Sequence, residues 1–138
     1  MVGCATGPAF STYSASVPPT SSGEGRVWFY RPSKMVGVAV QPHVYVNGTE
    51  VGKAQPGCYF FTDLAPGAYE AKCSTEWSDT CKFQIAPGDE KYMRLTLGIG
   101  LFVGHIIPKE VSREKGLAEI ANCKLITADG ANSDLKAK

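Results

Sequence analysis

The sequence predicts a mainly β protein, built as a single antiparallel β-sandwich with one short helix near its C-terminus. Turn signals recur at a spacing of about ten residues, and the segments between them alternate apolar and polar side chains. The turn signals are Asn47-Gly48, Pro56-Gly57, Pro66-Gly67, Pro87-Gly88 and Gly98. Short strands between regularly spaced turns are typical of antiparallel sandwiches and barrels.

The first strand is predicted where a run of β-branched and aromatic residues begins at Gly25. It contains Arg26-Val27-Trp28-Phe29-Tyr30 and is stopped by Pro32. Asn47-Gly48 then lies between two apolar segments and predicts a type I′ hairpin turn, which needs a positive φ at both central residues. Each Pro-Gly pair predicts a type II turn, because proline fixes φ at the first central position and glycine supplies the positive φ of the second.

Two later strands show clear alternation, so each is expected to have one buried face. The predicted inward residues are Tyr69, Ala71, Cys73, Cys81, Phe83 and Ile85, and the predicted outward residues are Glu70, Lys72, Lys82 and Gln84. A polar loop centred on Trp77 separates the two strands.

The C-terminal part departs from this pattern. Residues Ser112 to Asn122 predict one helix, with Ser112 as its N-cap and Glu114 in its first turn. A short strand is expected over Cys123 to Ile126, followed by a polar tail. The predicted organisation is therefore a tether over residues 1–24, a β-sandwich domain over residues 25–127 and a disordered tail over residues 128–138.

The N-terminus resembles a bacterial lipoprotein processing site, because the small residue Gly3 precedes Cys4 at the head of a segment rich in Ser, Thr, Pro and Gly. Such a cysteine becomes the first residue of the mature chain and carries acyl groups, which supply the membrane affinity. Residues 5–24 would form a flexible tether. No apolar stretch approaches the roughly 20 residues needed to span a bilayer, so the membrane would be bound through the lipid on Cys4. Ala5 is compatible with outer-membrane sorting. The expected location is the bacterial envelope, as an outer-membrane lipoprotein facing the periplasm.

The charge balance argues against a nucleic-acid partner. The chain has 14 basic and 13 acidic residues, a net charge of +1, and no run of like charges.

Four cysteines remain if Cys4 is acylated, and an even number suits an exported protein with disulfides. Cys73 and Cys81 lie on the apolar faces of their strands across a short loop, so a disulfide between them is predicted. Cys58 and Cys123 are the pair left over. No two cysteines have the C-x₂₋₄-C spacing of structural zinc sites, so no metal is expected.

Four segments together resemble a family of bacterial lipoproteins catalogued as the domain of unknown function family 2846. They are Gly25 to Ser33, Val44 to Gly48 with Val51-Gly52, Gly57 to Phe60, and Leu64 to Tyr69. The Leu-x-Pro-Gly-x-Tyr entry to the last segment also resembles PEGA and transthyretin-like sandwiches. The resemblance implies an envelope-facing sandwich of immunoglobulin or transthyretin type, and it implies no catalytic residues.

No set of residues predicts catalysis or a cofactor. His43 and His105 lack a ligand or acid partner at a suitable spacing, and no G-x-S-x-G elbow occurs. Residues Gly98 to Gly104 contain three glycines but lack the spacing of a phosphate-binding loop. The chain is therefore not expected to be an enzyme.

Two segments are candidates for contact with a partner protein. Trp77 lies in a polar loop, where it is either folded back over the sheet edge or offered to a partner, and tryptophan is favoured at binding hot spots. The apolar run that contains Gly98, Leu101 and Phe102 is the second candidate.

The leading hypothesis is a membrane-tethered, non-enzymatic binding or scaffolding module with an envelope protein as partner. The alternatives are a periplasmic inhibitor or immunity protein that blocks a hydrolase or toxin, and a metal or small-ligand carrier.

Overall fold

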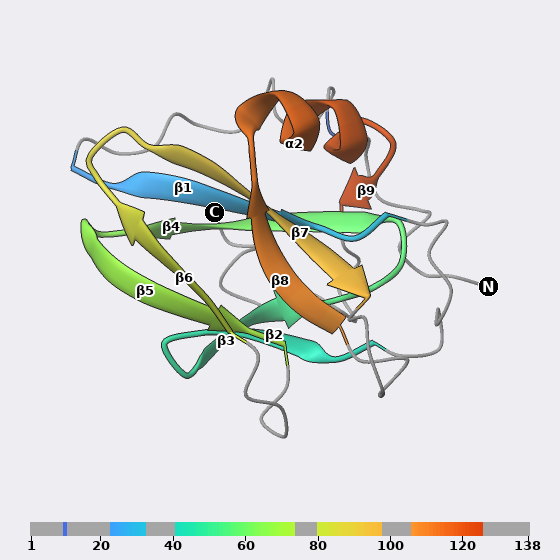
Figure 1. Cartoon of the computed structure of the whole chain (residues 1–138), viewed down its shortest axis with the longest axis horizontal. Coiled ribbons are helices and arrows are strands. Elements are labelled where there is room, and N and C mark those ends of the chain that lie inside the picture. The colour runs from blue at the N-terminus through green and yellow to red at the C-terminus, as the bar shows by residue number, and fades with distance from the viewer. Residues whose placement is uncertain (1–9, 11–22, 33–40, 74–79, 98–105, 126–138) are drawn as a thin grey trace.

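Two β-sheets pack face to face, and a helix lies on the far side of the larger sheet (Figure 1). The structure is a computed structural model that describes residue 10 and residues 23–32, 41–73, 80–97 and 106–125. Its elements are β1 (Gly25–Tyr30), β2 (His43–Val46), β3 (Thr49–Lys53), β4 (Cys58–Leu64), β5 (Gly67–Lys72), β6 (Thr80–Ile85), β7 (Glu90–Leu97), β8 (Ile106–Val111), α2 (Arg113–Ile120) and β9 (Lys124–Leu125).

The larger sheet, sheet A, has the strand order β8-β7-β1-β4-β9, and the smaller one, sheet B, has the order β3-β2-β5-β6. The predicted sandwich of mainly β structure with one short helix is therefore confirmed. The prediction that its sheets are purely antiparallel is wrong, because β1 is parallel to β7 and β4 is parallel to β9. Parallel neighbours need a long crossover. Between β1 and β7 the chain runs through β2 to β6, and between β4 and β9 it runs through β5 to β8 and helix α2.

Most of the turns follow the predicted chemistry. Asn47 and Gly48 have φ values of 50° and 83°, as a type I′ hairpin turn requires. Gly57 and Gly88 have φ values of 71° and 83°, and backbone hydrogen bonds of 3.1 and 3.0 Å close their four-residue turns. Both are type II turns. Gly67 differs, because its φ is 156° and it is the first residue of β5.

The main core lies between the two sheets and contains the apolar residues that alternation places inward. Its buried members are Val27, Phe29, Val44, Val46, Val51, Ala54, Cys58, Phe60, Ala71, Cys73, Phe83, Ile85, Met93, Leu95 and Ile106. Tyr69 and Cys81 pack against it, half-buried. The two predicted strand faces around the Trp77 loop are therefore confirmed.

A second apolar cluster lies on the outer face of sheet A. Its buried members are Phe10, Trp28, Tyr30, Tyr59, Phe61, Tyr92, Ile120 and Cys123. Helix α2 covers part of this cluster, and the Ser112 hydroxyl accepts a hydrogen bond of 3.2 Å from the Lys115 backbone amide, as predicted for an N-cap. Every residue of β1 is consequently buried, because this strand has a packed layer on both faces.

The structure has neither of the predicted disulfides, since Cys58, Cys73, Cys81 and Cys123, all among the described residues, are present as thiols. For the first pair, Ala71 and not Cys73 stands opposite Cys81. Cys73 is therefore a diagonal neighbour, and the Cα atoms of such residues are typically about 7–8 Å apart, near or beyond the reach of a disulfide.

For the second pair, Cys58 belongs to the core between the sheets and Cys123 to the cluster on the outer face of sheet A. The two side chains therefore lie on opposite sides of sheet A. Cys58 and Cys123 are predicted to pair only because they are the two cysteines left over, and this says nothing about the side of the sheet on which each one lies.

Candidate functional site

The solvent-facing side of sheet B is the candidate site. Sheet A is packed on both faces, by sheet B on one and by helix α2 and Phe10 on the other. Sheet B is packed against sheet A on one face, and its other face carries side chains that solvent reaches. A polar, solvated face of this kind can hold a partner without any change in the core.

We define the exposed face of sheet B by the outward-pointing residues of its four strands. They are His43, Tyr45, Glu50, Lys53, Ala68, Glu70, Lys72, Thr80, Lys82 and Gln84, all exposed or half-buried. Alternation in the sequence predicts that four of these residues point outward, but it does not show that β5 and β6 share a sheet with β2 and β3. The strand order shows this, because β2 pairs with β5, whose paired residues lie more than 20 positions later in the chain.

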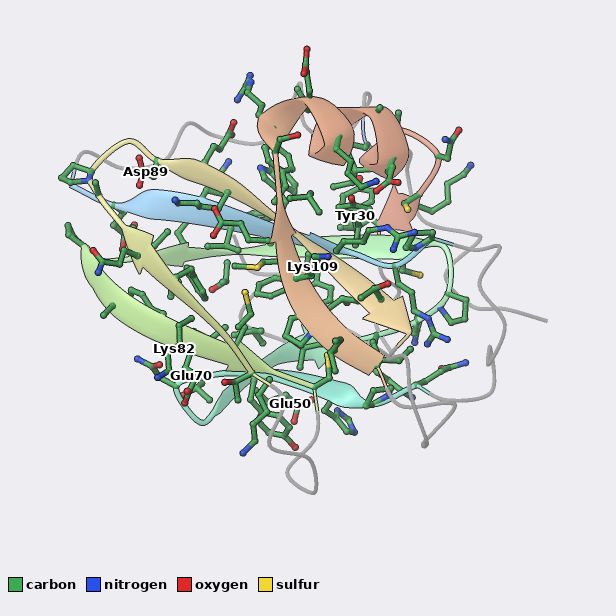
Figure 2. The ribbon with its side chains drawn as sticks, viewed as in Figure 1. Tyr30, Glu50, Glu70, Lys82, Asp89 and Lys109 are labelled. Atoms are coloured by element: carbon green, nitrogen blue, oxygen red, sulfur yellow. The ribbon has the colours of Figure 1, made fainter. Side chains whose placement is uncertain are left out.

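Charges of opposite sign stand next to each other on this face. The register places Glu70 opposite Lys82, and Figure 2 shows the two side chains together on sheet B, away from helix α2. The Thr80 hydroxyl donates a hydrogen bond of 3.2 Å to Glu70 Oε2. Lys82 forms no ion pair with any residue that the structure describes, so its ammonium group is available to a carboxylate on a partner.

A hydrogen-bonded pair lies at the other side of the same face. His43 Nδ1 and Glu50 Oε2 are 2.7 Å apart, and both side chains are about half exposed. Within the described ranges, no group of three His, Cys, Asp or Glu residues could hold a metal ion.

A shallow hollow of about 440 Å³ opens in this face where the β2–β3 hairpin ends. It is lined by Asn47, Ala68, Tyr69, Glu70, Lys82, Phe83 and Gln84. Two features of the chain form it. Strand β2 pairs with β5 only at Tyr45 and Val46, and Ala68 contributes only a methyl group.

Asn47 fixes the rim of this hollow. Its backbone amide donates a hydrogen bond of 2.9 Å to the Glu70 carbonyl, and its side-chain Oδ1 accepts one of 2.9 Å from the Glu70 amide. The hollow thus presents an amide, a carboxylate and an ammonium group on a rigid frame. Small-molecule pockets are usually deep, whereas this hollow is open to solvent, so it is better suited to contact with a protein surface.

A separate polar cluster joins helix α2 to sheet A. The Tyr30 hydroxyl donates a hydrogen bond of 2.5 Å to Glu119 Oε1, and Arg94 Nε donates one of 3.1 Å to the same oxygen. Lys115 Nζ lies 3.5 Å from Glu119 Oε2. Tyr30 is fully buried beneath the helix (Figure 2), so this cluster positions α2 and is not a surface for binding.

The environment of this cluster changes the acidity of its members. Burial, with a further contribution from the hydrogen bond to Glu119, raises the pKa of the Tyr30 phenol well above its ordinary value. Burial alone would also raise the pKa of the Glu119 carboxyl. The hydrogen bond from Tyr30 and the positive charges of Arg94 and Lys115 outweigh that effect and lower it.

All four partner-binding residues expected from the sequence lie outside the described residues. These are Trp77, Gly98, Leu101 and Phe102, together with the acylation candidate Cys4. No helix in the ranges that the structure describes is long and apolar enough to cross a membrane.

One residue of the predicted tether was missed altogether. Phe10 is 9% exposed and packs on the outer face of sheet A. The sequence feature that points to its burial is an aromatic side chain within a segment rich in serine, threonine and proline.

The model of a family described as "Protein of unknown function (DUF2846)" matches residues 21–105. This range contains every strand of sheet B and strands β1, β4 and β7 of sheet A, and it ends before β8. No curated protein and no solved structure matches the chain.

Proposed function

Since this chain belongs to the family described as "Protein of unknown function (DUF2846)", and since the matched range contains the whole exposed face of sheet B, we propose that it is a non-enzymatic binding module of the bacterial envelope. In this proposal an acyl group on Cys4 attaches the protein to the membrane, and the exposed face of sheet B binds another envelope protein. The observation that carries the binding role is the pair of unlike charges in the hollow, Glu70 and Lys82, on neighbouring strands of an exposed sheet face.

The rigidity of this face supports a binding role. Its side chains stand on strands whose opposite faces are packed into the main core. Ala71, next to Glu70 on β5, and Phe83, next to Lys82 on β6, are both buried there. Little conformational entropy is then lost when a partner docks, which favours affinity. The alternation of charge would select a partner with the complementary pattern, because placing like charges against each other across an interface costs several kcal/mol.

The composition of the face also suits a reversible protein contact. Tyr45 is half-buried at the centre of the strand order, where an amphipathic ring can contribute to a contact. The flanking charged residues resemble the polar rim of a non-obligate interface.

The location is tested by fractionation of cells that express the chain with its native signal. The protein should sediment with membranes, and the Cys4→Ser variant should move to the soluble periplasmic fraction. Recovery of an unacylated Met1 terminus from the cells would contradict the tether.

The binding face is tested by photo-crosslinking in the same cells, with a crosslinking amino acid placed at position 84 or 109. Gln84 is an exposed, uncharged residue that lines the hollow, and Lys109 is an exposed residue of β8 in sheet A, so position 109 is the matched control (Figure 2). Position 84 should give one discrete adduct and position 109 none. Glu70→Lys should abolish the adduct, whereas Glu110→Lys, a charge reversal on β8, should leave it. Adducts of the same mass from both positions would mean that this face is not the binding surface.

A further inference from the structure

Phe10 occupies a slot between two aromatic residues on the outer face of sheet A. Its ring centroid lies 5.0 Å from that of Trp28 and 5.5 Å from that of Tyr59, with interplanar angles of 80° and 83°. Both are edge-to-face contacts, which are favourable for aromatic pairs at these separations. The slot therefore holds the ring in a defined geometry.

The wall of this slot is braced from behind. Trp28 packs against Phe61 with a centroid separation of 5.0 Å, and the Arg26 guanidinium lies 4.5 Å from the centroid of the Phe61 ring. Asp63 accepts two hydrogen bonds from Arg26, at 2.7 and 3.0 Å. These contacts fix the aromatic wall independently of Phe10, so the slot would persist as an exposed aromatic surface if the ring left.

We infer that Phe10 docks the N-terminal segment in this slot. A Cys4 attached to the membrane then holds the outer face of sheet A toward the bilayer, and the exposed face of sheet B is directed away from the bilayer. This inference rests on the proposed function for the lipid on Cys4. It goes beyond that proposal by assigning an orientation and a binding site for the chain's own segment.

The length of the free segment decides the geometry. Phe10 lies six positions after Cys4, and an extended chain covers at most about 3.6 Å per residue, so the attachment point lies within about 20 Å of the slot. If the whole segment up to Gly25 were free, the same arithmetic would allow about 75 Å. Docking of one ring therefore shortens the reach of the tether more than threefold.

The position of the slot decides which side faces the membrane. Phe10 packs on the face of sheet A that carries helix α2, and sheet B packs on the opposite face. Two packed sheets are separated by about 10 Å, so the exposed face of sheet B lies across the full thickness of the sandwich from the slot. A tether of about 20 Å that starts on the outer side of sheet A favours that side facing the bilayer.

Docking itself is tested in solution, without any lipid. In a Trp77→Phe background, Trp28 is the remaining tryptophan, and its 2% exposure predicts weak quenching by acrylamide. Phe10→Ala should increase this quenching several-fold and shift the emission to longer wavelength, whereas Ser11→Ala should change neither. Phe10→Leu, which retains an apolar side chain, should give an intermediate value. Circular dichroism checks that each variant is folded. Unchanged quenching in folded Phe10→Ala would overturn the inference.

Orientation is tested with a phospholipid coupled chemically to Cys4 through a maleimide, in a Cys81→Ala background, because the other three cysteines are buried. The protein is then placed on phosphatidylethanolamine and phosphatidylglycerol vesicles, and lysines are modified with an amine reagent that does not cross membranes. Lys115 on α2 reports the outer side of sheet A, and Lys82 reports the exposed face of sheet B. Both are exposed.

Vesicle attachment should lower the labelling of Lys115 several-fold and leave that of Lys82 unchanged. Phe10→Ala should abolish this difference. Equal labelling of both lysines in the unsubstituted chain, or protection of Lys82, would overturn the orientation. Because the lipid is attached chemically, this outcome is distinct from failure of native acylation, which the fractionation of Cys4→Ser tests separately.

Discussion

The Tyr30 hydroxyl and the Glu119 carboxylate, separated by 89 positions in the chain, form a hydrogen bond of 2.5 Å that connects the central strand of sheet A to helix α2. The carboxylate also accepts a hydrogen bond of 3.1 Å from Arg94 on β7. One side chain of the helix thus contacts two strands, which fixes where the helix lies across the sheet.

Tyr30→Phe should destabilise the fold. The substitution removes a hydrogen bond to a charged group and leaves the partly buried carboxylate with one donor fewer, which typically costs about 1–3 kcal/mol. The free energy of unfolding in urea is the measurement. Tyr45→Phe, on the exposed face of sheet B, is the matched control and should change that free energy by less than about 0.5 kcal/mol. Equal effects of the two substitutions would show that the contact contributes nothing specific.

Acid should weaken the attachment of α2 through Glu119. Its pKa is lowered in the folded protein, so the unfolded chain binds the proton more tightly. The stabilisation is therefore present above the ordinary carboxyl pKa and is lost as the pH falls through the lowered value. Glu119→Gln should be less stable than the unsubstituted chain at neutral pH, and the difference should shrink progressively in acid. Thermal unfolding from neutral pH into the acid range measures this, and a difference that grows in acid would contradict it.

All four cysteines that the structure describes should react as thiols once the protein unfolds, and only Cys81 should react readily before that. Burial raises the pKa of the Cys73 thiol to about 12, and burial likewise raises the pKa of the half-buried Cys81 thiol. In native protein, alkylation should be slow at Cys58, Cys73 and Cys123 and faster at Cys81. After unfolding without a reductant, all four should be modified, as mass spectrometry would show. Two cysteines that stay unmodified until a reductant is added would instead indicate a disulfide.

Gly116→Ala should destabilise the protein although alanine is the better helix former. A Cβ atom at position 116 would lie 2.5 Å from Tyr92 Cβ, because helix α2 packs directly on β7 at this point. The gain in helix propensity is at most about 1 kcal/mol, whereas overpacking in a closed core costs about 1–3 kcal/mol. Glu114→Ala, at an exposed position of the same helix, is the control and should be close to neutral. Urea unfolding decides, and a more stable Gly116→Ala variant would mean that the helix can move away from the sheet.

Local rules determined much of this fold from the sequence alone. The Asn47-Gly48 turn, the type II turns at Gly57 and Gly88 and the Ser112 cap depend on backbone preferences of a few adjacent residues, and each forms as predicted. The inward and outward residues of β5 and β6 follow from the two-residue period of a strand.

Tertiary structure alone decided which strands became neighbours and what lies on each face of a sheet. Alternation gives no strand direction, so the parallel pairing of β1 with β7 was not predictable from it. An even number of cysteines does not reveal that Cys58 and Cys123 lie on opposite sides of sheet A. The exposed face of sheet B and the docking of Phe10 arise from contacts between residues far apart in the chain. Such contacts depend on the packing of whole sheets, and the local pattern around each residue carries no information about them.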